Sequence, residues 1–154
     1  MPRLLLDRFI PFRLSVLTNK VSSAIARHYS ERFGLSIPEW RVMAVLGDTP
    51  GLSAREVAER TAMDKVQVSR AVASLIESGR VARTPDDDDA RVGHLGLTGA
   101  GFAVYEQIVP LALGLERRFL AALNREERDA LDRLLDKLNR QARRLSRNPP
   151  PSAA

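Results

Sequence analysis

The segment Asp64–Ser78 carries side chains that could contact the edges of DNA base pairs. Arg70 could donate two parallel hydrogen bonds to O6 and N7 of guanine, and Gln67 could pair in a similar way with adenine. Val66 offers an apolar contact for the methyl group of thymine. These three residues lie within little more than one helical turn, so a helix in the major groove could present them together.

Neighbouring side chains suit the phosphate backbone, which positions a protein on DNA without reading its sequence. Lys65 and Ser69 can each donate a hydrogen bond to a phosphate oxygen, and Ser53 is a further candidate for a DNA contact. The small side chain of Ala73 would let the helix approach the groove closely. The alternative interpretation is that all of these are solvated residues on an ordinary amphipathic helix.

The opposite face of the same segment has the apolar period of a helix that packs on a core. This face consists of Val68, Val72, Leu75 and Ile76. We expect it to contact Val57 and Ala58 of the preceding helix. Asp64 and Gln67 have the spacing of a capping box, in which the side chain of Gln67 would reach back to the amide of Asp64. The sequence therefore predicts a helix that begins at Asp64 and ends before Gly79.

Three further capping signatures mark the starts of other helices. They are Ser36–Glu39, Ser53–Glu56 and Asn124–Glu127. Gly47–Gly51 separates the first two of these helices, and Thr61–Met63 forms a tight turn before Asp64. Two short helices joined by a tight turn are typical of a helix-turn-helix.

Two short extended runs follow, Val81–Thr84 and Arg91–Leu97, with Pro85 and Asp86–Asp89 as the turn between them. This pattern predicts a small β-hairpin. A hairpin directly after a helix-turn-helix is a wing, so the order of elements predicts a winged helix-turn-helix.

Long helices flank this region on both sides. The first, residues 6–33, is indicated by the helical period of Leu6, Ile10, Leu14, Leu17, Val21, Ile25 and Tyr29, with Gly34 as its stop. Thr98 begins another that runs to about Leu123, and Pro110 should kink it. The last carries Leu131, Leu134, Leu135, Leu138 and Leu145. The expected fold class is therefore mainly α with a small β-hairpin wing.

Composition limits the classes of protein that fit. The 154 residues are 44% apolar and have a net charge of +5, which favours a polyanionic partner such as nucleic acid or an acidic membrane. No apolar run approaches the roughly 20 residues that a membrane-spanning helix needs, so we expect a soluble cytoplasmic protein with no membrane partner. The absence of cysteine excludes disulfides, cysteine-ligated metals and thiol chemistry.

No pattern in the sequence predicts an enzyme, a metal site or a cofactor. The run Asp86–Asp89 is not an EF-hand loop, because Arg91 and Leu97 stand where that loop requires glycine and glutamate. The chain also lacks a credible catalytic triad or a cleft with paired carboxylates. Of the two histidines, His28 and His94, we expect one in a pocket or core and the other on the surface of a wing strand.

The chain resembles the MarR family of bacterial transcription regulators over about Leu6 to Leu145. The resemblance is carried by Ser36–Leu46, Leu52–Ala58, Asp64–Arg70, Asp89–Arg91 and Leu97–Thr98. Each motif is weak alone, but their order and spacing together are specific. The resemblance implies a homodimer that binds double-stranded DNA, with a pseudo-palindromic operator whose half-sites lie about one helical turn apart.

The resemblance also divides what we expect to be one structural domain into four parts. These are an N-terminal dimerisation helix at 1–34, a winged helix-turn-helix DNA-binding region at 35–98, C-terminal dimerisation helices at 99–147 and a disordered tail at 148–154. Burial supports dimerisation through the N- and C-terminal helices. So much apolar surface lies at the two ends that a monomer has little core left to cover it.

In the wing, the resemblance implies that Arg91 enters the minor groove, that Asp89 orients it through an ion pair, and that Arg83 meets a phosphate. This sequence departs from the family pattern at Asp86–Asp88, which places an acidic turn beside the wing. Such a turn is repelled by a phosphate backbone. Either the turn points away from DNA or the wing contributes little to binding.

Many proteins of this family release DNA when a small molecule enters a crevice between the dimerisation helices and the DNA-binding lobe. Candidates for such a crevice are Arg13, Asn19, His28 and Trp40. Arg13 could hold a carboxylate, and Trp40 could stack on an aromatic ring. The alternative is that Trp40 belongs to the core and that Arg13 is a surface or interface charge.

The sequence as a whole predicts a sequence-specific transcriptional repressor that is released by a small-molecule ligand, with an aromatic acid as the candidate class. The alternative is a dimeric adaptor module that has a winged-helix shape but does not bind DNA. The acidic turn in the wing is the best support for this alternative.

Overall fold

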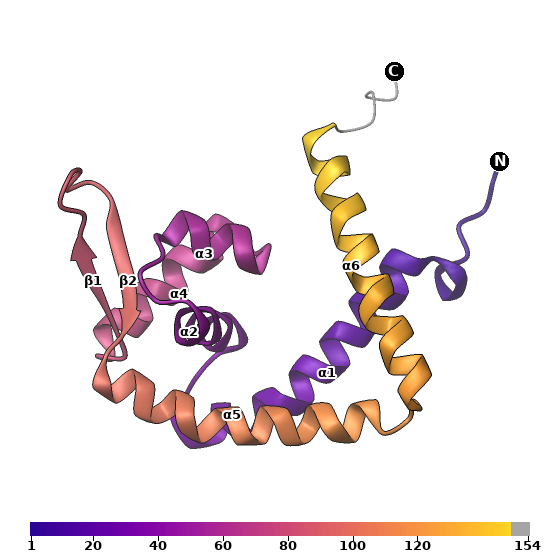
Figure 1. Ribbon diagram of the computed structural model, residues 1–154, viewed down its shortest axis with the longest axis horizontal. Coiled ribbons are helices and arrows are strands. Elements are labelled where there is room, and N and C mark those ends of the chain that lie inside the picture. The colour runs from indigo at the N-terminus through magenta and orange to yellow at the C-terminus, as the bar shows by residue number, and fades with distance from the viewer. Residues whose placement is uncertain (149–154) are drawn as a thin grey trace. The chain divides into compact units, whose positions relative to one another are not determined.

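A computed structural model describes residues 1–148 of the chain (Figure 1). The elements in order are η1 (Leu6–Arg8), α1 (Ile10–Phe33), α2 (Ile37–Asp48), α3 (Ala54–Thr61), α4 (Lys65–Glu77), β1 (Val81–Pro85), β2 (Gly93–Leu97), α5 (Gly99–Leu120) and α6 (Arg125–Arg147). This is the mainly helical fold with a small hairpin that the sequence predicts. The tail predicted to be disordered, 148–154, lies outside the described residues except for Asn148. None of the helices within 1–148 is both long and apolar enough to cross a bilayer.

The helices begin where the capping signatures predict. Ser36, Ser53 and Asn124 each accept a hydrogen bond from the amide three residues later, and the glutamate at that position accepts one in return. The start of α4 differs, because the carboxylate of Asp64 accepts from the amides of both Val66 and Gln67. Within the described residues, the side chain of Gln67 returns no hydrogen bond. The predicted capping box at Asp64 is therefore wrong in its second half: the Asp64 side chain caps α4, but the Gln67 side chain does not accept the Asp64 amide.

The second strand of the hairpin, β2, is shorter than the predicted run Arg91–Leu97. β1 and β2 pair antiparallel, with Val81 opposite Leu97 and Pro85 opposite Gly93. Arg91, expected in the second strand, lies in the turn. The reason is a pair of backbone hydrogen bonds that close the turn before the ladder starts: the amide of Val92 donates to the carbonyl of Asp89, and the amide of Asp86 donates to the carbonyl of Val92.

The core lies between α1, α2, α3, α4, the hairpin and the first half of α5. Its fully buried members include Tyr29, Met43, Leu75, Leu95 and Ile108. The helices α2, α3 and α4 contact one another and lie side by side in Figure 1.

One predicted core residue is exposed. The buried residues of α4 are Val68, Ala71, Val72 and Leu75, whereas Ile76 keeps 39% of its surface exposed. At 100° per residue, Ile76 lies about 80° around the helix from Val68. It therefore falls outside the stripe that meets the core, and the smaller Ala71 takes the inward place.

By its internal contacts, the described chain separates into two compact units, one of residues 1–113 and one that starts at Gly114. The boundary falls inside α5, which continues through Pro110 without interruption. In the second unit, the guanidinium of Arg128 donates to the carbonyls of Leu120 and Leu123, so the start of α6 is tied to the end of α5.

Candidate nucleic-acid interface

The helix-turn-helix consists of α3, the turn from Ala62 to Asp64, and α4. Ala62 adopts a left-handed conformation with φ of 53°, which ends α3 sharply and lets α4 leave in a new direction. The candidate contact residues of α4 are all exposed: Lys65, Val66, Gln67, Ser69, Arg70 and Ala73. The exposed fraction of Val66 is 56%, so its apolar side chain is free to contact a partner. The structure therefore brings the predicted base-reading residues together on one solvent-facing surface.

A hollow runs beside this face, between α4 and the start of α2. It is lined by Ser36, Pro38, Glu39, Gln67, Arg70, Ala71 and Ser74. Across it, the hydroxyl of Ser74 donates to Oε2 of Glu39 at 3.0 Å, while Oε1 of the same carboxylate accepts the amide of Ser36 at 3.1 Å. The sequence assigned Glu39 only a local capping role. No sequence signal pairs it with Ser74, because the two are 35 positions apart.

Ser53 stands at the N-terminus of α3. Its hydroxyl oxygen accepts the amide of Glu56 at 3.2 Å, so the hydroxyl hydrogen remains available to a phosphate. The return hydrogen bond from the Ser53 amide lowers the pKa of Glu56. The capping box thus keeps one carboxylate ionised beside a predicted phosphate contact.

The wing is joined to the helix-turn-helix by backbone pairing. The amide of Leu95 donates to the carbonyl of Leu52 at 2.8 Å, and the amide of Gly51 donates to the carbonyl of Leu95 at 2.9 Å. The loop before α3 therefore forms an isolated β-bridge to β2. This pairing holds the wing at a defined place beside α3 and α4.

The tip of the wing carries the predicted ion pair. Nε of Arg91 lies 3.1 Å from Oδ1 of Asp89, and the amide of Arg91 donates to the same oxygen at 3.0 Å. These hydrogen bonds lower the pKa of Asp89. The side chain of Arg91 is 92% exposed, so the pair directs it without covering it. On β1, the exposed side chain of Arg83 lies over Gly93, where a larger residue would collide with it.

The acidic turn is partly neutralised inside the wing. Asp86 contacts His94 at 2.9 Å and Asp89 contacts Arg91, and both carboxylates are half-buried. Asp87 and Asp88 are exposed. Asp89 therefore has a cationic partner, and Asp86 has one when His94 is protonated, which weakens the electrostatic argument against a DNA contact by the wing.

Comparisons with known proteins agree with this geometry. A family model described as the MarR family matches residues 33–92, which cover α2 to the wing turn. The crystal structure of the MarR family transcriptional regulator SPO1453 from Silicibacter pomeroyi is 30% identical, with a TM-score of 0.74, and covers 88% of this chain and 99% of that one. The chain belongs to the MarR family. It is thus a transcriptional regulator with a winged helix-turn-helix fold.

Two other relatives place most of the chain in this family. A MarR/EmrR family transcriptional regulator from Acinetobacter has a TM-score of 0.84 at 28% identity, over 92% of this MarR family chain and 99% of its own. The HTH-type transcriptional repressor Rv2887 of Mycobacterium tuberculosis is 27% identical over 124 residues, which are 80% of this chain and 86% of the repressor.

The four residues predicted to line an effector crevice are not brought together within one chain of this MarR family protein. Trp40 packs against Tyr29, with ring centroids 5.8 Å apart. Arg13 is on the same helix as Tyr29 but 16 positions earlier, which corresponds to about 24 Å along α1. Arg13, Asn19 and His28 are exposed, whereas Trp40 is partly buried and packs against the core. One chain therefore does not bring all four together, and their place in an effector crevice stays a prediction.

A different cation lies near the aromatic cluster. Nη2 of Arg41 donates to the hydroxyl of Ser22 at 3.3 Å, and its charge acts on Tyr29. Burial raises the pKa of the Tyr29 phenol, and Arg41 partly offsets this. Arg41 follows Trp40 directly in the sequence. That adjacency was the one signal that could have drawn attention to Arg41.

Proposed function

We propose that this protein binds a pseudo-palindromic operator as a homodimer and represses transcription until an acidic aromatic molecule releases it. The observation that carries the proposal is the exposed face of α4, where Val66, Gln67 and Arg70 stand side by side. In this proposal they contact base edges in the major groove. Ser53, Lys65, Ser69 and Arg83 contact phosphates, and Arg91, oriented by Asp89, enters the minor groove.

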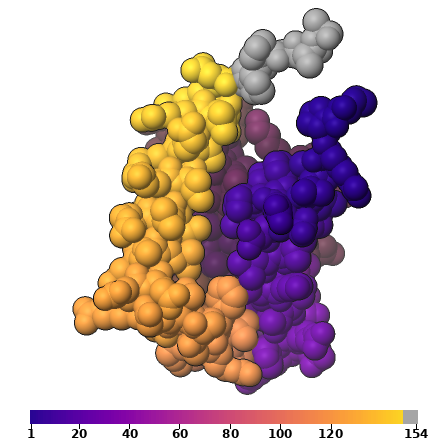
Figure 2. All heavy atoms as spheres, turned by 90° about the vertical axis from the view of Figure 1, so that its right-hand side faces the viewer, coloured from indigo at the N-terminus to yellow at the C-terminus, as the bar shows by residue number. Residues whose placement is uncertain are grey.

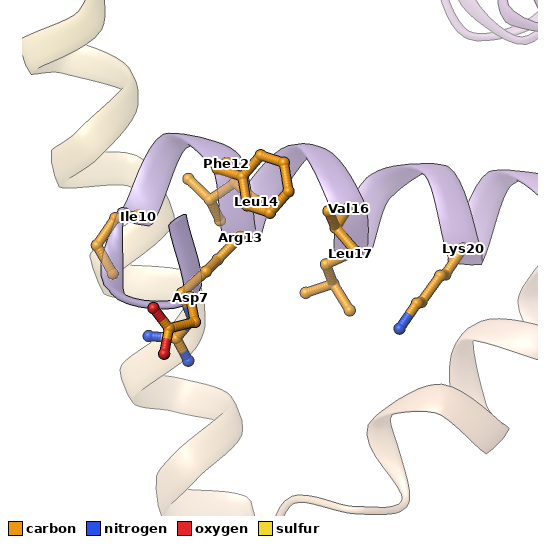
Figure 3. A pocket seen from close by; sticks show the side chains of 8 residues that line it. All are labelled: Asp7, Ile10, Phe12, Arg13, Leu14, Val16, Leu17 and Lys20. Atoms are coloured by element: carbon orange, nitrogen blue, oxygen red, sulfur yellow. The ribbon is translucent and has the colours of Figure 1, made fainter. Parts of the chain in front are cut away.

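Dimerisation is supported by apolar surface that the single chain leaves open. On the first part of α1, an open hollow is lined by Asp7, Ile10, Phe12, Arg13, Leu14, Val16, Leu17 and Lys20 (Figure 3). Four of its apolar side chains, those of Ile10, Phe12, Leu14 and Leu17, are between 42% and 51% exposed. The indigo atoms of Figure 2 belong to this N-terminal region and lie on the surface. Apolar patches of this kind mark protein–protein contacts.

The last helix presents a second such surface. On α6, the leucines Leu134, Leu135, Leu138 and Leu145 are between 44% and 57% exposed. They recur at the spacing of one helical face. A second copy of the chain is the partner that would cover both surfaces in a two-fold dimer.

The effector proposal is supported by aromatic and cationic groups that lie close together. Trp40 stands between Tyr29 and Tyr105, with ring centroids 5.8 and 6.0 Å away. Arg41 provides a guanidinium beside this cluster, and a guanidinium can bind a carboxylate through two hydrogen bonds. We therefore expect an aromatic acid to bind here, with Arg41 taking the role that the sequence suggested for Arg13.

A titration of the DNA upstream of the protein's own gene tests the proposal. We expect salt-sensitive binding to a duplex with two half-sites about one helical turn apart. Aromatic acids added to the complex should release the DNA. The acid should release less DNA from the Arg41→Ala variant than from the Arg13→Ala variant. If no duplex binds in a salt-sensitive way, the adaptor function replaces this one.

A further inference from the structure

His94 of β2 stands between two segments that are far apart in the sequence. Its Nδ1 lies 2.9 Å from the carbonyl oxygen of Gly51, in the loop that precedes α3. Its Nε2 lies 2.9 Å from Oδ1 of Asp86, in the wing turn. The imidazole ring therefore connects the helix-turn-helix with the tip of the wing.

The number of N–H groups that the two contacts need indicates the charge of the His94 ring. A carbonyl oxygen and a carboxylate oxygen can only accept hydrogen bonds, and a neutral imidazole has a single N–H. Both contacts are hydrogen bonds only when His94 is an imidazolium, which has two N–H groups. A protonated Asp86 could donate instead, but its hydrogen bond with His94 lowers the pKa of Asp86.

A chain of hydrogen bonds continues from Asp86 to the wing arginine. Oδ2 of Asp86 accepts the amide of Asp89 at 3.3 Å. Oδ1 of Asp89 then accepts the amide of Arg91 at 3.0 Å and its Nε–H at 3.1 Å. His94 holds one end of this chain and Arg91 forms the other.

The charged groups around His94 favour its protonated form. The hydrogen bond to Asp86 raises the pKa of His94 most, followed by the hydrogen bond to the Gly51 carbonyl, and Glu56 of α3 adds to this through its charge. Arg60 of α3 acts on Glu56. Across the hairpin, the residue paired with His94 is Thr84, which carries no charge.

We propose that His94 is a positioning residue for Arg91 and that it acts only as an imidazolium. In this form it donates hydrogen bonds to both Asp86 of the wing turn and Gly51 of the loop before α3, an arrangement we call the clasp. The clasp fixes the position from which Arg91 would enter the minor groove. When the proton leaves, one of the two hydrogen bonds is lost and the turn is released. This inference rests on the proposed function, in which Arg91 contacts DNA.

The direction of the pH dependence follows from the raised pKa of His94. The clasp is fully present at pH values below the ordinary histidine pKa of about 6.5, and it is lost as the pH rises through the higher value in the folded protein. DNA affinity should therefore fall as the pH rises above the ordinary histidine pKa of about 6.5.

The experiment measures operator affinity between about pH 6 and about pH 9 at constant ionic strength. We expect the affinity of the wild-type protein to fall by about tenfold, as is reasonable when a charged contact is no longer held in place. His94→Gln cannot be protonated, so it should bind weakly at every pH.

Asp86→Asn keeps the inference testable if His94→Gln disturbs the wing. The side-chain amide that this change introduces can donate to the neutral Nε2 while Nδ1–H still donates to Gly51, so the clasp should persist and the pH dependence should disappear. Asp87→Asn removes the same charge from an exposed position and should keep the wild-type pH profile.

Two outcomes separate this inference from the proposed function. If Arg91→Ala leaves the affinity at about pH 6 unchanged, the proposed role of the wing fails. If Arg91→Ala weakens binding but His94→Gln and Asp86→Asn keep the wild-type profile, the clasp alone is overturned.

Proton NMR of the free protein gives a readout that does not involve DNA. The chain has two histidines, so His94→Gln assigns the imidazole signals by removing one. The His94 signal should titrate above the ordinary range, and Asp86→Asn should move that titration to lower pH. Titration of His94 at or below its ordinary value would overturn the inference.

Discussion

The carboxylate of Glu39 joins α2 to α4 through the hydroxyl of Ser74, which donates to its Oε2 at 3.0 Å. Ser74 lies one helical turn beyond Arg70 on α4. The hydrogen bond therefore opposes rotation of α4 about its own axis. A residue that the sequence marks only as a cap thus helps to fix which side chains of α4 face solvent.

Because the two side chains act as a pair, Ser74→Ala and Glu39→Ala should not have additive effects. Each change should lower the free energy of unfolding by about 1 kcal/mol, and the double variant should lose less than the sum. Chemical denaturation of the four proteins measures the coupling, and operator titration of Ser74→Ala measures its effect on affinity. Additive losses would show that the hydrogen bond contributes no stability.

Arg70→Ala should cost about 1–3 kcal/mol of operator binding and relax specificity at one base position, because a bidentate contact to guanine would be lost. Competition among operators that differ at single positions measures this effect. Lys65→Ala is the matched comparison. Because Lys65 is proposed to contact a phosphate, its loss should weaken binding to every sequence alike and reduce the salt slope by about one unit. Uniform weakening by Arg70→Ala would instead make Arg70 a phosphate contact.

Gly101→Ala should destabilise the protein by about 1–3 kcal/mol, because an added Cβ would overlap the backbone carbonyl of Arg80. That carbonyl also accepts the amide of Thr98, so it is not free to move. Thermal unfolding measures the loss. Gly99→Ala, two residues earlier, meets open space and should be neutral or slightly stabilising. Equal effects at both positions would point to helix propensity rather than to the close approach of α5.

Leu138→Asp should dissociate the proposed dimer, because burying an unpaired carboxylate in an apolar dimer interface costs much free energy. Sedimentation velocity should then report the mass of a single chain, and operator affinity should fall. Arg140→Asp places a carboxylate about 200° around α6 from Leu138 and should leave the dimer intact. A monomeric wild-type protein would remove the basis of this prediction.

Features that depend on neighbours a few residues apart could be predicted from the sequence. The capping boxes that begin at Ser36, Ser53 and Asn124 form as predicted, since each needs only residues three positions apart. The bounds of α4 follow from local pattern as well. The ion pair between Asp89 and Arg91, which the family resemblance implies, also joins residues only two positions apart.

Contacts between side chains far apart in the sequence follow only from how the helices pack. Ala71 rather than Ile76 faces the core, because the position of α2 and α3 selects the stripe of α4 that is covered. Arg13 lies 16 positions before Tyr29 on α1, whereas Arg41 lies beside the aromatic cluster of Tyr29 and Trp40. These relationships depend on packing, which a local pattern does not encode.

The acidic wing turn illustrates the division most clearly. In the sequence, Asp86 belongs to a run of four carboxylates that argues against a DNA contact. In the folded protein, hairpin register and the pairing of Leu52 with Leu95 bring His94 between Asp86 and Gly51. The charge pattern is a property of the sequence, but its electrostatic effect depends on which cations the fold places beside it.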